Sequence, residues 1–411
     1  MVTPTTQPVN ALCFALHFCY DGAWTRAIRF LRCQQVSLNS DDEYPLPAAI
    51  HVRRYPLSNP GRHDAKQPSN IDEYTEEGRF MTEKLHLTLA CGDYESIYAI
   101  KEGIVKPDGI ELTVLTEMDS STRHWRMIRH RAFDICELSG ASYILGKSKG
   151  EQDFTAIPVF LHRRFRHGFV FVNARKGIEK PTDLIGRKIG LKTFQATALV
   201  WIRGILEDEF DLPYKTVNWY AEKEEDVPFD PPPGLTLVRT PSGKRVETLL
   251  AEGELDGVIH PDIISPILDR DPRVKRLFDN YKALEVEYVQ RTGIFPIMHV
   301  TAIKQEIVDR YPWVPMNLMM AFERAKEIAY QRMENPRRVP LAWFRDAVEE
   351  QEAILGKDPW VYGLNAANRH NLETLIRYAH HQGMIQKPLS VDDLFDPSAR
   401  GEEWRLPSSR G

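Results

Sequence analysis

The sequence has no excess of positive charge. Its 411 residues include 53 lysines and arginines and 58 aspartates and glutamates, so the formal net charge is −5. Nucleic-acid binders neutralise phosphates with clustered lysine and arginine, and this chain sustains no such clustering. The composition therefore argues against a nucleic-acid partner. Hydrophobic residues at 42% and charged residues at 27% are ordinary for a globular protein.

Long hydrophobic runs are also lacking near the start of the chain. The longest run there, 11–16, stops at His17, whereas a membrane helix needs about 20 apolar residues. The first basic residue, Arg26, follows this run, although a secretory signal carries its positive charge before the apolar stretch. The residues before Cys19 do not fit a lipoprotein cleavage site. We therefore expect a cytoplasmic protein without a membrane partner.

Cysteine is scarce. There are five cysteines, an odd number, and none stand in a Cys-x-x-Cys arrangement. Disulfide frameworks use even sets and structural zinc sites use close pairs, so neither is expected. The histidines also lack the His-x-His and His-Glu-x-x-His spacings of common metal sites. We therefore expect a reducing compartment and no bound metal.

The character of the chain changes near Met81. Residues 1–80 hold three of the five cysteines, scattered prolines and little hydrophobic periodicity. We interpret them as a poorly ordered extension, of the kind that a start codon assigned too far upstream would add. A regulatory segment is the alternative.

Short strands and helices alternate from Leu85 onward. Strands are expected at 85–90, 110–115, 133–138, 168–173, 187–191 and 255–259, and helices at 95–103, 121–130, 141–147, 195–210 and 245–252. This alternation is typical of parallel α/β sheets. Beyond residue 300 the chain is expected to be helical as far as about residue 383.

Two α/β lobes in series, closed by C-terminal helices, predict a two-lobed protein that binds its ligand in the cleft. The length fits this arrangement, since a domain holds about 150 residues. Lobe one is expected to comprise 84–165 together with 292–396, which includes the C-terminal helices. Lobe two is expected at 168–290.

Three segments, 92–96, 138–142 and 192–197, are candidates for the rim of this cleft. In open α/β sheets the ligand crevice lies beyond the carboxyl ends of the strands, where helix N-termini offer unpaired N–H groups. Hydroxyl-bearing and small residues stand at these positions. The candidate substrate-binding residues are Ser96, Ser139, Ser142, Thr193, Gln195 and Thr197. For any one segment helix capping is the better explanation, whereas the three together favour a cleft.

The basic segment 162–167 concentrates charge between two apolar strands. It contains three arginines and two histidines, which is unfavourable beside a core unless an anion joins them. The planar guanidinium fork of arginine matches a carboxylate. An exposed basic turn is the alternative. Two further histidines, His260 and His299, end apolar runs, and each could donate a proton if it faces the cleft.

Four stretches of the chain carry a family resemblance. They are Arg164-Phe-Arg-His167, the pair 195–197 and 201–204, Thr292-Gly-Ile-Phe-Pro-Ile-Met-His299, and Asp358-Pro-Trp-Val-Tyr-Gly363. Together they resemble the 4,5-dihydroxyphthalate decarboxylase family, over about residues 84 to 396. This resemblance implies a type 2 periplasmic-binding-protein-like fold. It also implies that 4,5-dihydroxyphthalate, or a related hydroxylated aromatic acid, loses one carboxylate to give 3,4-dihydroxybenzoate and carbon dioxide.

The implied chemistry needs a clamp for the remaining carboxylate and a proton for the ring carbon. Our candidate clamps are Arg164, Arg166 and Arg203. Our candidate acid or base groups are His167, His260 and His299. Each carboxylate is para to one hydroxyl, which can feed electrons to the reacting carbon. No electron-sink cofactor is therefore required, and the sequence carries no phosphate-binding or dinucleotide glycine motif.

A non-enzymatic solute-binding protein for a small aromatic or carboxylate anion is the alternative function. The lack of an export signal counts against it, because a receptor coupled to a transporter must leave the cytoplasm. A thiamin-pyrimidine synthase shares the fold, but such enzymes carry a cysteine-rich iron motif, whereas Cys91 and Cys136 stand alone. The expected partner is thus a small aromatic dicarboxylate, and the sequence leaves a homo-oligomer open.

Overall fold

The computed structural model describes residues 84–401 except residue 242. The extension expected at 1–80 lies outside the described residues. The described residues all belong to one compact unit. None of the helices in this described part is long and apolar enough to cross a membrane.

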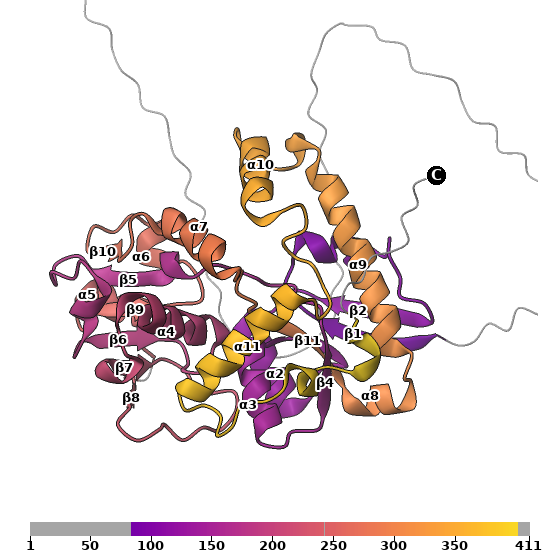
Figure 1. The fold of residues 1–411 in the computed structure, drawn as a ribbon, viewed down its shortest axis with the longest axis horizontal. Coiled ribbons are helices and arrows are strands. Elements are labelled where there is room, and N and C mark those ends of the chain that lie inside the picture. The colour runs from indigo at the N-terminus through magenta and orange to yellow at the C-terminus, as the bar shows by residue number, and fades with distance from the viewer. Residues whose placement is uncertain (1–83, 242, 402–411) are drawn as a thin grey trace, which may run out of the picture. The chain divides into compact units, whose positions relative to one another are not determined.

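The first sheet has five strands in the order β2-β1-β3-β11-β4 (Figure 1). They are β1 (Leu85–Ala90), β2 (Ile110–Leu115), β3 (Ile135–Ser139), β4 (Phe154–Ile157) and β11 (His299–Lys304). Strand β1 is parallel to β2 and β3, whereas β11 is antiparallel to β3 and β4. The chain therefore leaves this sheet after β4 and returns to its middle through β11.

The second sheet has six strands in the order β10-β5-β9-β6-β7-β8. They are β5 (Val170–Asn173), β6 (Lys188–Leu191), β7 (Asn218–Ala221), β8 (Thr236–Arg239), β9 (Gly257–Ile259) and β10 (Val274–Arg276). Strands β8, β7, β6 and β9 are parallel, and β5 is antiparallel to β9 and β10. Two α/β sheets built from interleaved parts of one chain confirm the two-lobed, type 2 periplasmic-binding-protein-like fold.

Helices surround both sheets. The α-helices are α1 (Tyr98–Lys101), α2 (Ser120–His130), α3 (Gly140–Ser148), α4 (Thr197–Phe210), α5 (Val246–Glu252), α6 (Ser265–Leu268), α7 (Tyr281–Thr292), α8 (Gln305–Arg310), α9 (Val314–Met333), α10 (Phe344–Leu355) and α11 (Ala366–His381). Single 3₁₀ turns are η1 (Glu95–Ile97), η2 (His167–Phe169), η3 (Pro181–Leu184), η4 (Tyr214–Thr216), η5 (Pro336–Arg338), η6 (Val391–Leu394) and η7 (Pro397–Ala399).

The strand β3 lies in the middle of the first sheet and is buried along its whole length. Apolar residues such as Ile135 and Leu138 explain this burial, because a strand covered on both faces needs a continuous apolar run. Glu137 breaks the run and is nevertheless fully buried. A buried carboxylate needs partners of its own, and these partners belong to the site described below.

Two paired segments connect the sheets. The segment 158–169 leads from β4 to β5, and 293–298 leads from α7 to β11. Arg163 bridges Ile297 in an antiparallel pair, and the amide of Met298 donates to the carbonyl of His162 at 2.9 Å. The connecting segments thus carry His162 and Met298 to the junction of the two sheets.

Helix α11 provides a third link, because it packs against α3 on the first lobe and α4 on the second. Gly204 of α4 makes the second contact close. A Cβ atom on Gly204 would lie 2.4 Å from the ring of Tyr378 in α11, so only glycine allows this approach. Gly204 thereby sets how closely α4 packs against α11. Helix α4 begins at the ligand pocket.

Candidate active site

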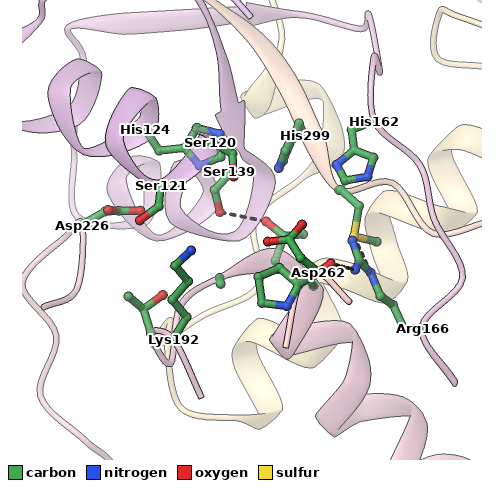
Figure 2. Close-up of a pocket in the computed structure, with 16 residues that line it drawn as sticks. Ser120, Ser121, His124, Ser139, His162, Arg166, Lys192, Asp226, Asp262 and His299 are labelled. Atoms are coloured by element: carbon green, nitrogen blue, oxygen red, sulfur yellow. Dashed lines mark hydrogen bonds between the residues drawn. The ribbon is translucent and has the colours of Figure 1, made fainter. Parts of the chain in front are cut away.

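A pocket opens where the two lobes meet (Figure 2). The end of β3, helix α2 and the start of β11 form its wall on the first lobe, and the residues after β6 and β9 form its wall on the second. Its labelled lining residues are Ser120, Ser121, His124, Ser139, His162, Arg166, Lys192, Asp226, Asp262 and His299. The volume is about 60 Å³. A water takes about 10–15 Å³ in the same measure, so the pocket holds only a few waters.

His299 is anchored by a buried carboxylate. Its Nδ1 lies 2.6 Å from Oε1 of Glu137, and its ring lines the pocket. Within the described residues no protein hydrogen bond uses the second nitrogen, Nε2. Because Glu137 can only accept when ionised, it selects the form of His299 that carries a proton on Nδ1. The arrangement leaves Nε2 as the atom that can meet a ligand.

Glu137 is held in its ionised form by several partners. Arg123 Nη2 donates to Oε2 at 2.7 Å, and the amide of Gly92 donates to the same oxygen at 2.8 Å. The hydroxyl of Tyr94 donates to Oε1 at 2.8 Å. Burial alone would raise the pKa of the Glu137 carboxyl, but His299 and Arg123 hold this pKa well below its usual range. The charge on Glu137 therefore persists at any neutral pH.

Two more histidines flank His299. The ring centroids of His124 and His299 are 4.8 Å apart, and those of His162 and His299 are 4.9 Å apart. Burial, reinforced by the nearby His299, lowers the pKa of both His124 and His162 well below the usual value. Both rings are therefore neutral at physiological pH. Among the described residues, His124 Nε2 and His162 Nδ1 have no hydrogen-bond partner, so both are available to a ligand.

Two cations lie on the other walls of the pocket. Arg166 in the first connecting segment donates from Nη1 to the carbonyl of Pro261 at 2.7 Å, and its Nε lies 3.1 Å from Met298 Sδ. Burial lowers the pKa of this guanidinium to about 9, so it stays charged at neutral pH. Lys192 follows β6 and lines the pocket from the second lobe (Figure 2). These two cations share the pocket with the carboxyl groups of Asp226 and Asp262.

Hydroxyl groups join the lobes at the base of the pocket. Ser139 Oγ lies 2.8 Å from Thr197 Oγ1, which also accepts from the amide of Ala141 at 3.0 Å. Ser142 Oγ lies 3.1 Å from Ser139 Oγ. The expected residues Ser139, Thr193 and Thr197 line the pocket, as do Arg166 and His299, and Ser142 adjoins them. Helix capping is also present, since Ser139 accepts from the amide of Ser142 at 3.4 Å.

Arg203 does not reach the pocket. It lies in α4, a helix buried on all sides from Thr197 to Leu206. Its guanidinium carbon is 3.7 Å from the ring centroid of Phe194, and it donates to Gln382 Oε1 at 2.8 Å. These contacts use Arg203 to join α4 to the end of α11, so the structure gives no support for a carboxylate clamp at this position.

Two of the expected histidines also lie outside the pocket lining. His167 packs against Phe210, Phe278 and Tyr288, and this burial lowers its pKa to about 4. His260 uses Nδ1 to accept from the amide of Asp262 at 3.0 Å. It therefore shapes the turn that presents Pro261 and Asp262 to the pocket.

Three other expected residues point elsewhere. Arg164 is exposed, with its guanidinium 5.6 Å from the ring centroid of Phe169. Gln195 is buried and bonds the backbone of Val227. Ser96 follows β1 and is near the hydroxyl of Tyr362. None of the three lines the pocket.

The sequence interpretation missed several pocket residues, and some had a signal. Glu137 is one carboxylate within the buried strand Ile135-Cys-Glu-Leu-Ser139, and an acidic residue in such a run is rarely tolerated without a partner. His162 lies in the basic segment itself. His124, Lys192 and Asp226 had no comparable signal, because a helix and two loops place them by tertiary packing.

Comparisons with known proteins come from sequence and from structure. The chain is 34% identical over 324 residues to a 4,5-dihydroxyphthalate decarboxylase of Comamonas testosteroni, which covers 77% of this chain and 98% of that protein. It is 34% identical over 201 residues to a protein of the same name from Pseudomonas putida, covering 47% of this chain and 78% of that one. No family model matches. A periplasmic sulfonate-binding protein SsuA from Methylobacillus flagellatus is similar in structure, with 14% identity, a TM-score of 0.48 and coverage of 77% and 93%.

Proposed function

The chain belongs to the 4,5-dihydroxyphthalate decarboxylase family, and from this premise we propose that it decarboxylates 4,5-dihydroxyphthalate or a related hydroxylated aromatic acid. The products are 3,4-dihydroxybenzoate and carbon dioxide. One observation carries the proposal: His299, anchored on the buried Glu137, shares a pocket with the cations Arg166 and Lys192. A proton donor and an anion clamp are the two groups that this reaction needs.

The two cations suit a substrate with two adjacent carboxylates. Arg166 uses Nη1 and Nε within the protein, which leaves Nη2 for the carboxylate that stays on the ring. Lys192 is a point charge on a flexible stem and can follow the second carboxylate. We assign the clamp to Arg166 because its buried, doubly held guanidinium cannot swing away.

The proton comes from His299 in this proposal. Electron density from the hydroxyl para to the departing carboxylate reaches the ring carbon that carries this carboxylate. The Nε2–H of the imidazolium protonates that carbon, while Glu137 holds the Nδ1–H and stabilises the positive ring. The bond to the carboxylate then breaks, its electron pair restores the aromatic ring, and carbon dioxide leaves. The ring accepts the electrons itself, so no electron-sink cofactor is needed.

The neutral histidines complete the pocket. The unpartnered nitrogens of His124 and His162 can bind substrate oxygens without adding a charge beside His299. Their burial also keeps the walls of the pocket poor in water. Interactions with Arg166 and Glu137 are stronger in such surroundings.

The small volume of the pocket implies that the lobes separate when substrate enters. Typical ligand pockets span about 300–1,000 Å³, several times the about 60 Å³ found here. In this proposal the backbone bends at the connecting segments 158–169 and 293–298, which join the two sheets. Closure after entry would bring Lys192 and His299 onto the same ligand.

The test is incubation of the purified full chain with 4,5-dihydroxyphthalate after dialysis against a chelator. We expect carbon dioxide and 3,4-dihydroxybenzoate in equal amounts. Titration calorimetry with the same compound provides the comparison. Binding without any product would favour the solute-binding alternative, and neither binding nor product would overturn the proposed substrate class.

A further inference from the structure

A short chain of hydroxyl groups links Ser139 in the pocket to the carboxyl group of Asp226, which also lines it. It begins at Ser139, whose Oγ lies 3.1 Å from Ser142 Oγ. Ser142 Oγ lies 3.3 Å from Oδ2 of Asp226. Both serines are buried, at 3% and 1% exposure, so water does not compete for these contacts. The three side chains therefore form one connected path.

Asp226 occupies the place where the pocket meets larger spaces. It follows β7 in a loop of the second lobe and is half-buried. Besides the pocket itself, it lines two neighbouring cavities of about 560 and 390 Å³. Asp226, which Figure 2 labels among the pocket residues, therefore also borders these two larger cavities.

The surroundings of Asp226 suit a group that gains and loses a proton near neutrality. Burial raises the pKa of its carboxyl to about 6, and the hydrogen bond from Ser142 and the nearby charges of Arg129 and Lys223 offset only part of the effect. Glu225 on the same loop is a further negative neighbour, and its own two oxygens are committed to the amides of 194 and 195. Lys192 lines the same pocket as Asp226.

Helix capping does not account for this arrangement. Ser139 caps α3 by accepting from the amide of Ser142 at 3.4 Å. The Ser142 hydroxyl does not cap the helix. Ser142 lies within α3, and its hydroxyl contacts Ser139 and Asp226. The Ser142 hydroxyl instead connects Ser139 with Asp226.

We propose that Asp226 is the proton acceptor of the decarboxylation, reached through Ser139 and Ser142. This inference rests on the proposed function. The substrate hydroxyl para to the departing carboxylate gives its proton to Ser139 Oγ, Ser139 passes one to Ser142, and Ser142 passes one to Asp226. Hydroxyl hydrogens rotate freely enough for such a shift.

The proton balance of the whole reaction then closes. The phenolate left on the ring supplies electrons, His299 protonates the ring carbon, and the bond to the carboxylate breaks as carbon dioxide leaves. The product is a phenolate, which regains its proton from Asp226 by the reverse path. The relay is thus restored in each cycle, and the single proton consumed is the one that His299 recovers from solvent.

The test compares pH profiles of kcat/KM for the full chain and four variants. Because Asp226 must be ionised to accept, wild-type activity should rise through a pH near 6. D226N should lose this limb and turn over at least tenfold more slowly, and S142A should be slowed comparably. The double variant D226N/S142A should be no slower than the slower single variant. Either substitution already interrupts the path, so the second adds no further loss. D230N, an exposed change on the same loop, is the matched control and should match the wild type.

Four outcomes decide against the relay. A D226N profile that keeps the acidic limb would overturn it, and so would additive losses in the double variant. If D226N fails to fold, the S142A variant alone tests the relay. S142A interrupts the path, so a wild-type kcat in this variant would show that the path is not used. A wild type that binds but never releases carbon dioxide would overturn the proposed function and the relay together.

Discussion

Glu137 and His299 are diagonal neighbours on adjacent antiparallel strands, and their side chains meet at 2.6 Å. In the register of β3 and β11, His299 pairs with Ser139 and Thr301 pairs with Glu137. Residues two apart on a strand share a face, so the carboxylate, the serine hydroxyl and the imidazole project from the same side of the sheet. The sheet register therefore sets the geometry of the proton donor.

Loss of the charge at Glu137 should slow turnover and weaken the fold together. We expect E137Q to lower kcat by about 10²-fold or more, since general acid catalysis contributes about 10²–10⁴-fold and the imidazolium loses its counter-charge. Removing one partner of a buried ion pair costs about 3–5 kcal/mol, because Arg123 stays charged and buried. Steady-state kinetics and chemical unfolding measure the two effects.

Y94F is the matched control for E137Q. It removes one hydrogen bond to Glu137 and leaves the charge and its pairing with Arg123 in place. We expect it to cost about 0.5–1.5 kcal/mol of stability and to change kcat only slightly. Equal losses of kcat in E137Q and Y94F would contradict the account, because they would show that polar contact rather than charge matters.

Replacing the clamp should act on substrate binding. R166K keeps the charge but loses the planar fork, so we expect KM to rise by about one to two powers of ten, which corresponds to about 1.5–3 kcal/mol. R164K is the control, because Arg164 is exposed and outside the pocket lining. KM values for both variants decide the matter. A larger rise in KM for R164K than for R166K would show that Arg166 is not the clamp.

Arg203 should instead affect stability. R203K loses the stacking of the guanidinium on Phe194 and the hydrogen bond to Gln382. We expect a loss of about 1–3 kcal/mol in the free energy of unfolding, because buried donors and acceptors are left unpaired. KM should stay within a few-fold of the wild type. A rise in KM without a loss of stability would show that Arg203 acts on substrate binding after all.

This contrast shows what the sequence can and cannot predict. The alternation of strands and helices was predictable, because short apolar runs and helical periodicity are local features. Ser139 and Thr197 were predictable as pocket residues, because each stands where a helix starts after a strand. His299 was predictable as a candidate because a histidine that follows an apolar run can donate a proton if it faces a cleft. Arg203 was not, since α4 is buried all round and periodicity cannot tell a core-facing arginine from one that faces a cleft.

The neutral histidines make the fold sensitive to acid. The pKa of His162 is lower in the folded protein than the about 6.5 of an unfolded histidine, so the unfolded state binds more protons below that pH. The free energy of unfolding should therefore fall as the pH drops from 7 to 5, by up to about 1.4 kcal/mol per pH unit for each such group. Chemical unfolding at several pH values measures this slope.

The variants H162Q and H130Q locate the cause of that slope. H162Q removes one buried neutral imidazole, so the slope between pH 7 and 5 should become shallower. H130Q is the control, because His130 is exposed and should leave the slope unchanged. Identical slopes for wild type and H162Q would show that His162 is not held neutral in the folded protein.

The rate of carbon dioxide release by H299Q tests the central claim most directly. His299 is the anchored group that faces both the ligand pocket and the Glu137 carboxylate, whereas His260 only shapes the neighbouring turn. We predict that H299Q binds 4,5-dihydroxyphthalate with nearly unchanged affinity and releases carbon dioxide about 10²–10⁴-fold more slowly, and that H260Q stays within about tenfold of the wild type. Turnover by H299Q within about tenfold of the wild type would contradict His299 as the proton donor.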